Sequence, residues 1–396
     1  MAVQDDAAAI AGDLAELRRQ IHRDPEIGLD LPRTQAKVLA ALDGLPLEVT
    51  RGRALSSVTA VLRGARPGPT VLLRGDMDAL PITERTGLPY ASAVTGVMHA
   101  CGHDLHTAML AGAARLLAAR QAELPGNVIF MFQPGEEGQA GATHMISEGV
   151  LDAAGGRPVA AYALHAASAQ FPRGMFSTRP GSMMAAADIL DVTVRGHGGH
   201  ASQPHLAQDP IPAACEMVTA LQTLVTRRFD VFDPVVITVG SFHAGTADNI
   251  VPDEAHFLAT VRSFSAAARD RVRAGTLRLI ADLAAAHGLS AEADYLDGYP
   301  VTVNDPAETA FAEQAVADLF GADRLIAQAN PLPGAEDFSF VLDEVPGVFL
   351  MLGAVPDGSD PASAPFNHAA DAVFDDAVLP DGAALLAELA LRRLTA

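Results

Sequence analysis

The strand pattern of this chain changes along its length, and that change constrains the fold more than any other feature. In the first 180 residues, short continuous apolar runs are bounded by Gly and Pro, at 58–63, 70–75, 127–132 and 159–164. Between them, residues 105–120 carry apolar side chains at helical spacing. Continuous apolar strands separated by helices predict an α/β structure with a mostly parallel sheet.

The middle of the chain follows a different pattern. Strands are predicted at 188–195, 235–241, 255–261 and 291–296, and helices at 210–228 and 266–287. The first three of these strands alternate polar and apolar residues, as a strand exposed on one face does. The order β-α-β-β-α-β matches a ferredoxin-like unit. We therefore expect a larger domain formed by residues 1–184 and 298–396, interrupted by a smaller α+β domain formed by residues 185–297.

Charge and composition restrict the partners of the chain. Its 27 Lys and Arg against 48 Asp and Glu give a net charge of −21, which argues against nucleic acid and against an anionic membrane surface. Two cysteines, Cys101 and Cys215, cannot form a disulfide framework and favour a reducing compartment. The N-terminal residues 1–22 indicate one amphipathic helix rather than a signal peptide. We expect a cytoplasmic protein.

Polar side chains follow three of the apolar runs. Asp76 and Asp78 follow one run, Glu136 and Glu137 follow another, and His165 follows a third. Ligands of open α/β sheets bind at the carboxyl ends of strands, so these side chains predict a shared site. The alternative for the Glu pair alone is a solvated acidic loop.

The segment 99–106, HACGHDLH, brings a thiol, three imidazoles and a carboxylate together. Cys101 and His103 could bind one ion from a Gly-hinged turn, and this mixture of donors suits Zn, Mn, Ni or Co. A carboxylate beside a metal-bound water can act as a general base. The alternative is a structural loop with a buried Cys.

Three features of the predicted inserted domain could bind substrate. His200 ends a Gly-rich segment, Asn249 lies in a turn, and Arg262 ends a strand. Arg offers a bidentate clamp for a carboxylate. Each feature can also be explained without a role in binding, as a Gly-rich turn, a turn-forming Asn or a surface Arg.

Several long motifs resemble the amidohydrolase branch of the M20 metallopeptidase family, which includes hippurate hydrolases, N-acyl-amino-acid deacylases and auxin-conjugate hydrolases. The resemblance extends from about Leu14 to Leu391. The motifs are RGDMDALP at 74–81, MHACGHDLHTA at 98–108, FQPGEE at 132–137, GGHA at 198–201, NIVP at 249–252 and AEDFS at 335–339.

This resemblance implies a site with two divalent ions and a role for each candidate residue. Cys101 would bridge the ions, and the other ligands would be His103, Glu137, His165 and His368. Glu136 falls on the catalytic base, and Asp78 on a residue that orients a site group. His200, often supplied by the neighbouring subunit, would stabilise the oxyanion, and Asn249 and Arg262 would hold the substrate carboxylate. The smaller domain would serve as a lid and dimerisation domain, which implies a homodimer or a higher homo-oligomer.

The sequence departs from the family pattern in two places. The residues after His368 are Ala369-Ala370-Asp371, where a Pro is usual, and the residues after His165 are unusually small. Asp76 stands where the wider family commonly has a His ligand, and it is not expected to bind metal in this branch.

The hypothesis is a metal-dependent amidohydrolase that cleaves N-acyl amino acids, with Glu136 as general base. A dipeptidase or carboxypeptidase with the same two-metal chemistry is the first alternative. A non-catalytic binding protein and a thiol-redox role for Cys101 are alternatives from other classes.

Overall fold

The computed structural model describes residues 2–396, which form two compact units. The first unit comprises Met1–Met183, Val303–Asn330 and Asp337–Ala396. The second comprises Met184–Thr302 and Pro331–Glu336.

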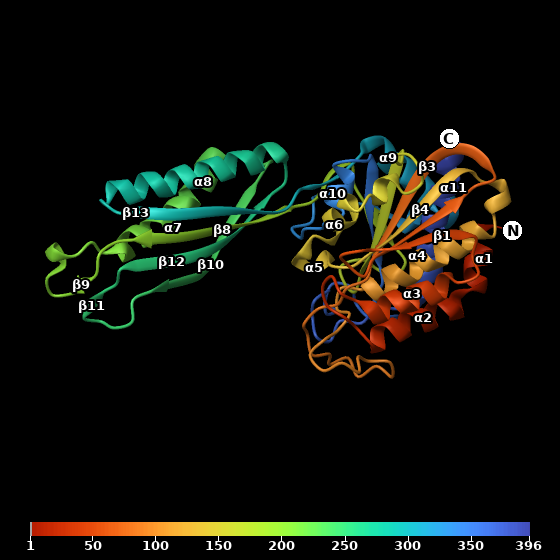
Figure 1. Ribbon diagram of the computed structural model, residues 1–396, viewed down its shortest axis with the longest axis horizontal. Helices are drawn as coiled ribbons and strands as arrows, with labels where there is room; N and C mark the ends of the chain where they lie inside the picture. Colours follow the sequence, from red (N-terminus) through yellow and green to blue (C-terminus); the bar gives the residue numbers. More distant parts are fainter. Residues whose placement is uncertain (1) are drawn as a thin grey trace. The chain divides into compact units, whose positions relative to one another are not determined.

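The first unit is built on an eight-stranded sheet in the order β1-β2-β4-β3-β5-β16-β6-β15 (Figure 1). The strands are β1 (Leu47–Arg51), β2 (Val58–Arg63), β3 (Arg66–Asp76), β4 (Pro125–Gln133), β5 (Ala160–Ala167), β6 (Phe176–Thr178), β15 (Leu325–Ala327) and β16 (Gly347–Gly353). The central neighbours β4, β3, β5 and β16 pair in parallel, and antiparallel pairings occur only toward the edges of this sheet. The predicted mostly parallel sheet is confirmed.

Helices bury the central strands of this sheet. They are α1 (Val3–Ala9), α2 (Ala11–Arg23), α3 (Pro32–Leu42), α4 (His103–Ala118), α5 (Glu136–Gln139), α6 (Gly141–Ser147), α9 (Pro306–Phe320), α10 (Ser339–Leu342) and α11 (Leu379–Thr395). Short 3-10 turns of this unit occur at Gln121–Glu123, Val150–Asp152, Ala322–Arg324 and Asp376–Val378, and one of the second unit occurs at Pro204–Leu206. Helices α4 and α11 pack against each other and against β3 and β5. Every residue of β16 is buried, as a central parallel strand requires.

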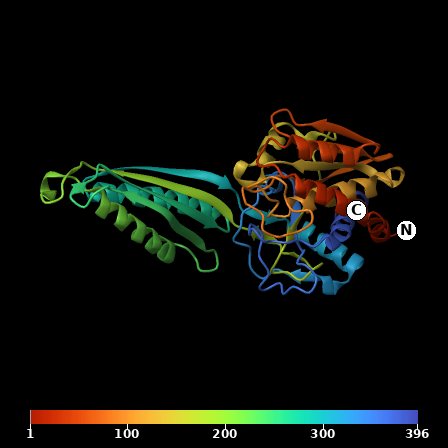
Figure 2. The same ribbon diagram turned by 90° about the horizontal axis from the view of Figure 1, so that it is seen from below.

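The N-terminal segment differs from the prediction. One amphipathic helix was expected over residues 1–22, but the structure has α1 and α2, separated at Ile10 with φ −103° and ψ 6°. Neither Gly nor Pro stands at the break. Helix α1 packs against α11, so the two ends of the chain lie side by side (Figure 2).

The second unit has a four-stranded antiparallel sheet in the order β10-β12-β8-β13. Its elements are β8 (Ala186–Arg195), α7 (Pro210–Arg228), β10 (Val235–Ala244), β12 (Glu254–Ser263), α8 (Ala266–Ala286) and β13 (Ser290–Tyr299). Both helices cover one face, where alternate residues of β8 such as Leu190 and Val192 are fully buried (Figure 2). The predicted ferredoxin-like unit is confirmed.

Four short strands complete the structure. Strand β9 (Gly199–His200) pairs with β11 (Ile250–Val251), and β7 (Gly181–Met184) pairs with β14 (Thr302–Asn304). Within residues 2–396, no helix combines the length and apolar character needed to span a bilayer.

Candidate metal centre

The carboxyl ends of three neighbouring strands carry the polar residues of the candidate centre. Asp76 ends β3 and pairs with Gln133 at the end of β4. His165 lies within β5, which continues to Ala167, whereas the sequence predicted that the strand stops before it. The parallel register therefore brings side chains far apart in the chain to one edge of the sheet, as expected.

The five predicted metal ligands lie together. Cys101 Sγ is 3.5 Å from His165 Nε2 and 3.2 Å from His368 Nε2. His368 Nε2 is 3.1 Å from Glu137 Oε1. Donor atoms within 4.8 Å of one another form two groups that share the thiol, one with His103 and His165 and one with Glu137 and His368.

The donor chemistry of these residues suits a divalent cation, and one of them, His103, lacks hydrogen-bond partners within the described chain, whose place a cation could take. His103 is fully buried, and neither of its ring nitrogens has a hydrogen-bond partner among residues 2–396. The nearest carboxylate oxygens, of Asp78 and Asp76, are 3.5 and 3.6 Å from the ring nitrogens. A buried imidazole nitrogen without a hydrogen bond is costly, and a bound cation would satisfy one of these nitrogens.

The thiol of Cys101 needs a cation in order to ionise. Burial and the nearby charge of Glu137 raise its pKa to about 12. The side chain therefore stays protonated near neutral pH unless a metal ion displaces the proton. Sulfur, imidazole and carboxylate donors together fit Zn, Mn, Ni or Co better than Mg or Ca.

Asp78 organises the turn that carries both glutamates. Its two carboxylate oxygens accept the backbone N–H groups of Glu136 and Glu137, each at 3.0 Å. The turn also needs Gly135 and Gly138, which have φ of 74° and 76°. Asp78 is 1% exposed, so these charge-assisted hydrogen bonds are shielded from water. A Glu136 carboxylate oxygen lies within 4.8 Å of donor atoms of His103 and Glu137, next to the ligands.

His106 lies behind the ligands, and sequence reasoning did not select it. Its Nδ1 is 2.5 Å from Asp76 Oδ1, and its Nε2 accepts the backbone N–H of Ala166 at 2.7 Å. Because Nε2 accepts, Nδ1 carries the proton that is donated to Asp76. The third His of the HACGHDLH segment was the available signal, one helical turn after His103.

Asp76 lies within reach of His103 and His106 but is already paired. Its second oxygen accepts Arg74 Nη1 at 2.6 Å. Burial alone would raise the pKa of Asp76, but Arg74, His103 and His106 hold it well below its usual value. Its exclusion from the ligand set stays a prediction, because the three donor atoms of Asp76, His103 and His106 also lie within 4.8 Å of one another.

The remaining predicted residues lie in the second unit. His200 ends β9 and pairs with Ile250 of β11, and the Asn249 carbonyl accepts the N–H of Ala201 at 3.1 Å. His200 and Asn249 are therefore neighbours, and both are exposed. Arg262 lies elsewhere, near the far end of β12, where it pairs with Ala187 and Val236.

Comparisons with known proteins place this arrangement in a family. The family model "Peptidase family M20/M25/M40" matches residues 72–392. The chain is 37% identical to an N-acetylcysteine deacetylase of Bacillus subtilis, over 86% of this chain and 88% of that protein. It is 35% identical to thermostable carboxypeptidase 2 of Saccharolobus solfataricus, over 98% of each.

A solved structure agrees with these relatives. The Bacillus subtilis YXEP protein, a dinuclear metal-binding peptidase of the M20 family, superposes with a TM-score of 0.84 at 32% identity, over 98% of this chain and 99% of that one. The chain therefore belongs to peptidase family M20/M25/M40 and is a metallo-amidohydrolase.

Proposed function

We propose that this protein hydrolyses the amide bond of N-acyl amino acids and uses two divalent ions held by Cys101, His103, Glu137, His165 and His368. The observation that carries the proposal is the pair of donor groups that share the Cys101 thiol, with Glu136 beside them. A shared thiolate fits two adjacent cations. Mn, Zn, Ni and Co are the candidates, since each accepts mixed sulfur, nitrogen and oxygen donors.

Bound divalent ions would polarise the amide carbonyl and make water more acidic. Glu136, 6% exposed, is the proposed general base that takes a proton from the attacking water and returns one to the leaving amine. Asp78 keeps that carboxylate in place through the two backbone hydrogen bonds of its turn. His200 is the proposed donor to the oxyanion of the tetrahedral intermediate.

The second unit supports a proposal that the enzyme works as a homodimer or a higher homo-oligomer. Asn249 lies beyond the Glu254 end of β12, because the pairing of β11 with β9 continues that of β12 with β8, and Arg262 lies near the other end of β12. The eight residue-to-residue steps of extended strand from Glu254 to Arg262 span about 26 Å. One substrate carboxylate cannot contact both side chains within one copy. The predicted clamp of Asn249 and Arg262 therefore needs a second copy to supply one of them.

The substrate class rests on the relatives and has one alternative. The deacetylase relative favours cleavage of an acyl group from an amino acid, with acetyl, benzoyl and arylacyl groups as candidates. The carboxypeptidase relative favours a dipeptidase or carboxypeptidase with the same metal chemistry. We further propose a cytoplasmic location, because a free thiol at the centre of the site suits a reducing compartment. We also propose that residues 1–184 and 298–396 form the catalytic domain and that residues 185–297 form a lid and dimerisation domain.

A substrate panel tests the proposal. Protein reconstituted with Mn, Zn, Co or Ni is assayed on acetyl-, benzoyl- and indoleacyl-amino acids and on dipeptides. Cys101→Ala protein prepared in parallel controls for contaminating hydrolases. We expect the highest kcat/KM on an N-acyl amino acid. Faster turnover of dipeptides supports the alternative, and no turnover of any member by metal-loaded protein contradicts both.

A further inference from the structure

Asn367 connects three chain segments that carry proposed metal ligands. Its Oδ1 accepts the backbone N–H of Ser168 at 2.9 Å and lies 3.1 Å from the Ser168 hydroxyl, whose single proton is shared with the Pro365 carbonyl at 2.9 Å. Its Nδ2 donates to the carbonyls of Cys101 at 3.1 Å and Ala166 at 3.0 Å. Both N–H donors of the amide are therefore used, its oxygen accepts the Ser168 backbone N–H, and the partners fix which atom is oxygen.

Each of these contacts lies at or beside a ligand. Cys101 is itself a proposed ligand, Ala166 directly follows His165, and Asn367 directly precedes His368. The amide nitrogen is also 3.9 Å from Cys101 Sγ, the atom shared by both donor groups. One side chain thus sets the spacing of three ligands whose positions in the chain differ by up to 267 residues.

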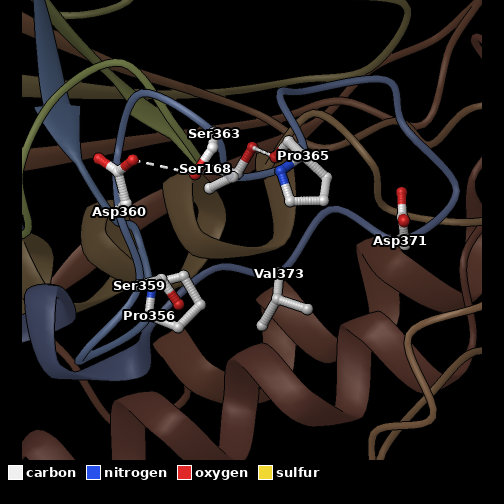
Figure 3. A pocket seen from close by; sticks show the side chains of 9 residues that line it. Ser168, Pro356, Ser359, Asp360, Ser363, Pro365, Asp371 and Val373 are labelled. Carbon is white, nitrogen blue, oxygen red and sulfur yellow. Dashed lines mark hydrogen bonds between the residues drawn. The ribbon is translucent and has the colours of Figure 1, made fainter.

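His368 needs such support because its backbone is strained and its side chain is exposed. Its φ is 72°, a left-handed conformation that side chains with a Cβ rarely adopt. Its side chain is 52% exposed, so little packing holds it. Residues of the loop that carries His368, such as Pro365, line a cavity of about 350 Å³ together with Ser168 and Val373 (Figure 3). Polar contacts must therefore supply the restraint that packing does not.

We infer that Asn367 is a positioning residue for the metal centre: it holds Cys101, His165 and His368 at the spacing that binds cations tightly. This inference rests on the proposed metal ligands. Groups that orient ligands from behind usually alter metal affinity about 10- to 100-fold when they are removed. A residue needed only to fold the loop would change stability and leave the affinity of the folded protein unaltered.

Asn367→Asp is the main test variant, because it keeps the size and the acceptor for Ser168 but loses both N–H donors. Ser168→Ala is the milder second variant, which removes the hydroxyl shared between Asn367 and the Pro365 carbonyl and keeps the backbone hydrogen bond to Asn367. Ser363→Ala is the matched control, since it removes a hydrogen bond to Asp360 (3.0 Å) in the same loop, away from the ligands. Circular dichroism establishes that each variant is folded.

The measurements are the dissociation constants of Mn and Co by chelator competition and the thiolate-to-metal absorption of the Co-loaded protein. We expect Asn367→Asp to weaken metal binding about 10- to 100-fold and to change the Co spectrum, with a smaller loss in Ser168→Ala and none in Ser363→Ala. Wild-type affinity and spectrum in folded Asn367→Asp overturn the inference. If Asn367→Asp does not fold, wild-type affinity in Ser168→Ala overturns it. Because these readouts need no substrate, absence of hydrolysis by the wild type would count against the proposed function alone.

Discussion

Asp78→Asn should lower catalysis because it breaks one of the two bonds that hold the turn of Glu136. The Asp78 carboxylate accepts two consecutive backbone N–H groups at 3.0 Å from a position that is 1% exposed. Asn keeps one acceptor oxygen and turns an NH₂ group toward the other N–H. One hydrogen bond to a charged group, worth about 1.5–3 kcal/mol, is lost. If the whole of this free energy is lost from stabilisation of the transition state, kcat/KM falls by about 10- to 150-fold.

The assay is steady-state hydrolysis of the best N-acyl amino acid at saturating metal, with bound metal measured in each preparation. Asp305→Asn is the matched control. Asp305 also accepts two consecutive backbone N–H groups, of Ala307 and Glu308 at 2.8 and 2.9 Å, but it does so at the start of α9. Asn is a good helix cap, so we expect wild-type kcat/KM for this control. A kcat/KM within twofold of wild type for fully loaded Asp78→Asn would refute the reasoning.

Three further predictions concern stability and metal. Asp188→Ala removes the buried carboxylate that accepts Arg269 at 2.6 and 3.0 Å, and it should destabilise the second unit by about 3–5 kcal/mol, measured by denaturant unfolding; an unchanged midpoint contradicts this. Gly382→Ala places a methyl 1.9 Å from Met109 Sδ and should lower the free energy of unfolding by about 1–3 kcal/mol. In the control Gly12→Ala the new methyl meets nothing within 4 Å, so that variant should be neutral or stabilising. Equal unfolding midpoints for the two variants would count against close packing of α4 and α11. Chelation should abolish turnover and lower Tm, since a cation that binds only the folded state stabilises it; activity in protein shown to be metal-free contradicts the metal assignment.

The secondary structure of the second unit was predictable because its signals are local. Period-two alternation marked β8, β10 and β12, and the predicted helix at 210–228 is α7, whose start is capped by the Asp209 side chain at 3.0 Å. The break at Ile10 was not predicted, because neither Gly nor Pro stands at it. Helix α1 packs against α11, a contact between the two ends of the chain that leaves no local signal in the sequence.

The candidate ligands could be proposed from strand ends and long motifs, but their supporting side chains could not. His106 contacts Ala166 60 residues away, and Asn367 contacts Cys101 266 residues away. Such bonds follow from sheet register and loop placement and leave no periodic signal along the chain. His368 is intermediate, since the resemblance to the family selected it while its sequence surroundings did not.

Glu136→Gln, compared with Glu137→Gln, tests the central claim most directly. Both variants are measured for bound metal and for hydrolysis of the best N-acyl amino acid. We predict that Glu136→Gln keeps wild-type metal affinity and loses turnover by about 10²- to 10⁴-fold, as expected for a lost general base. Glu137→Gln should instead lose metal affinity. Near-normal turnover in metal-loaded Glu136→Gln would contradict the account.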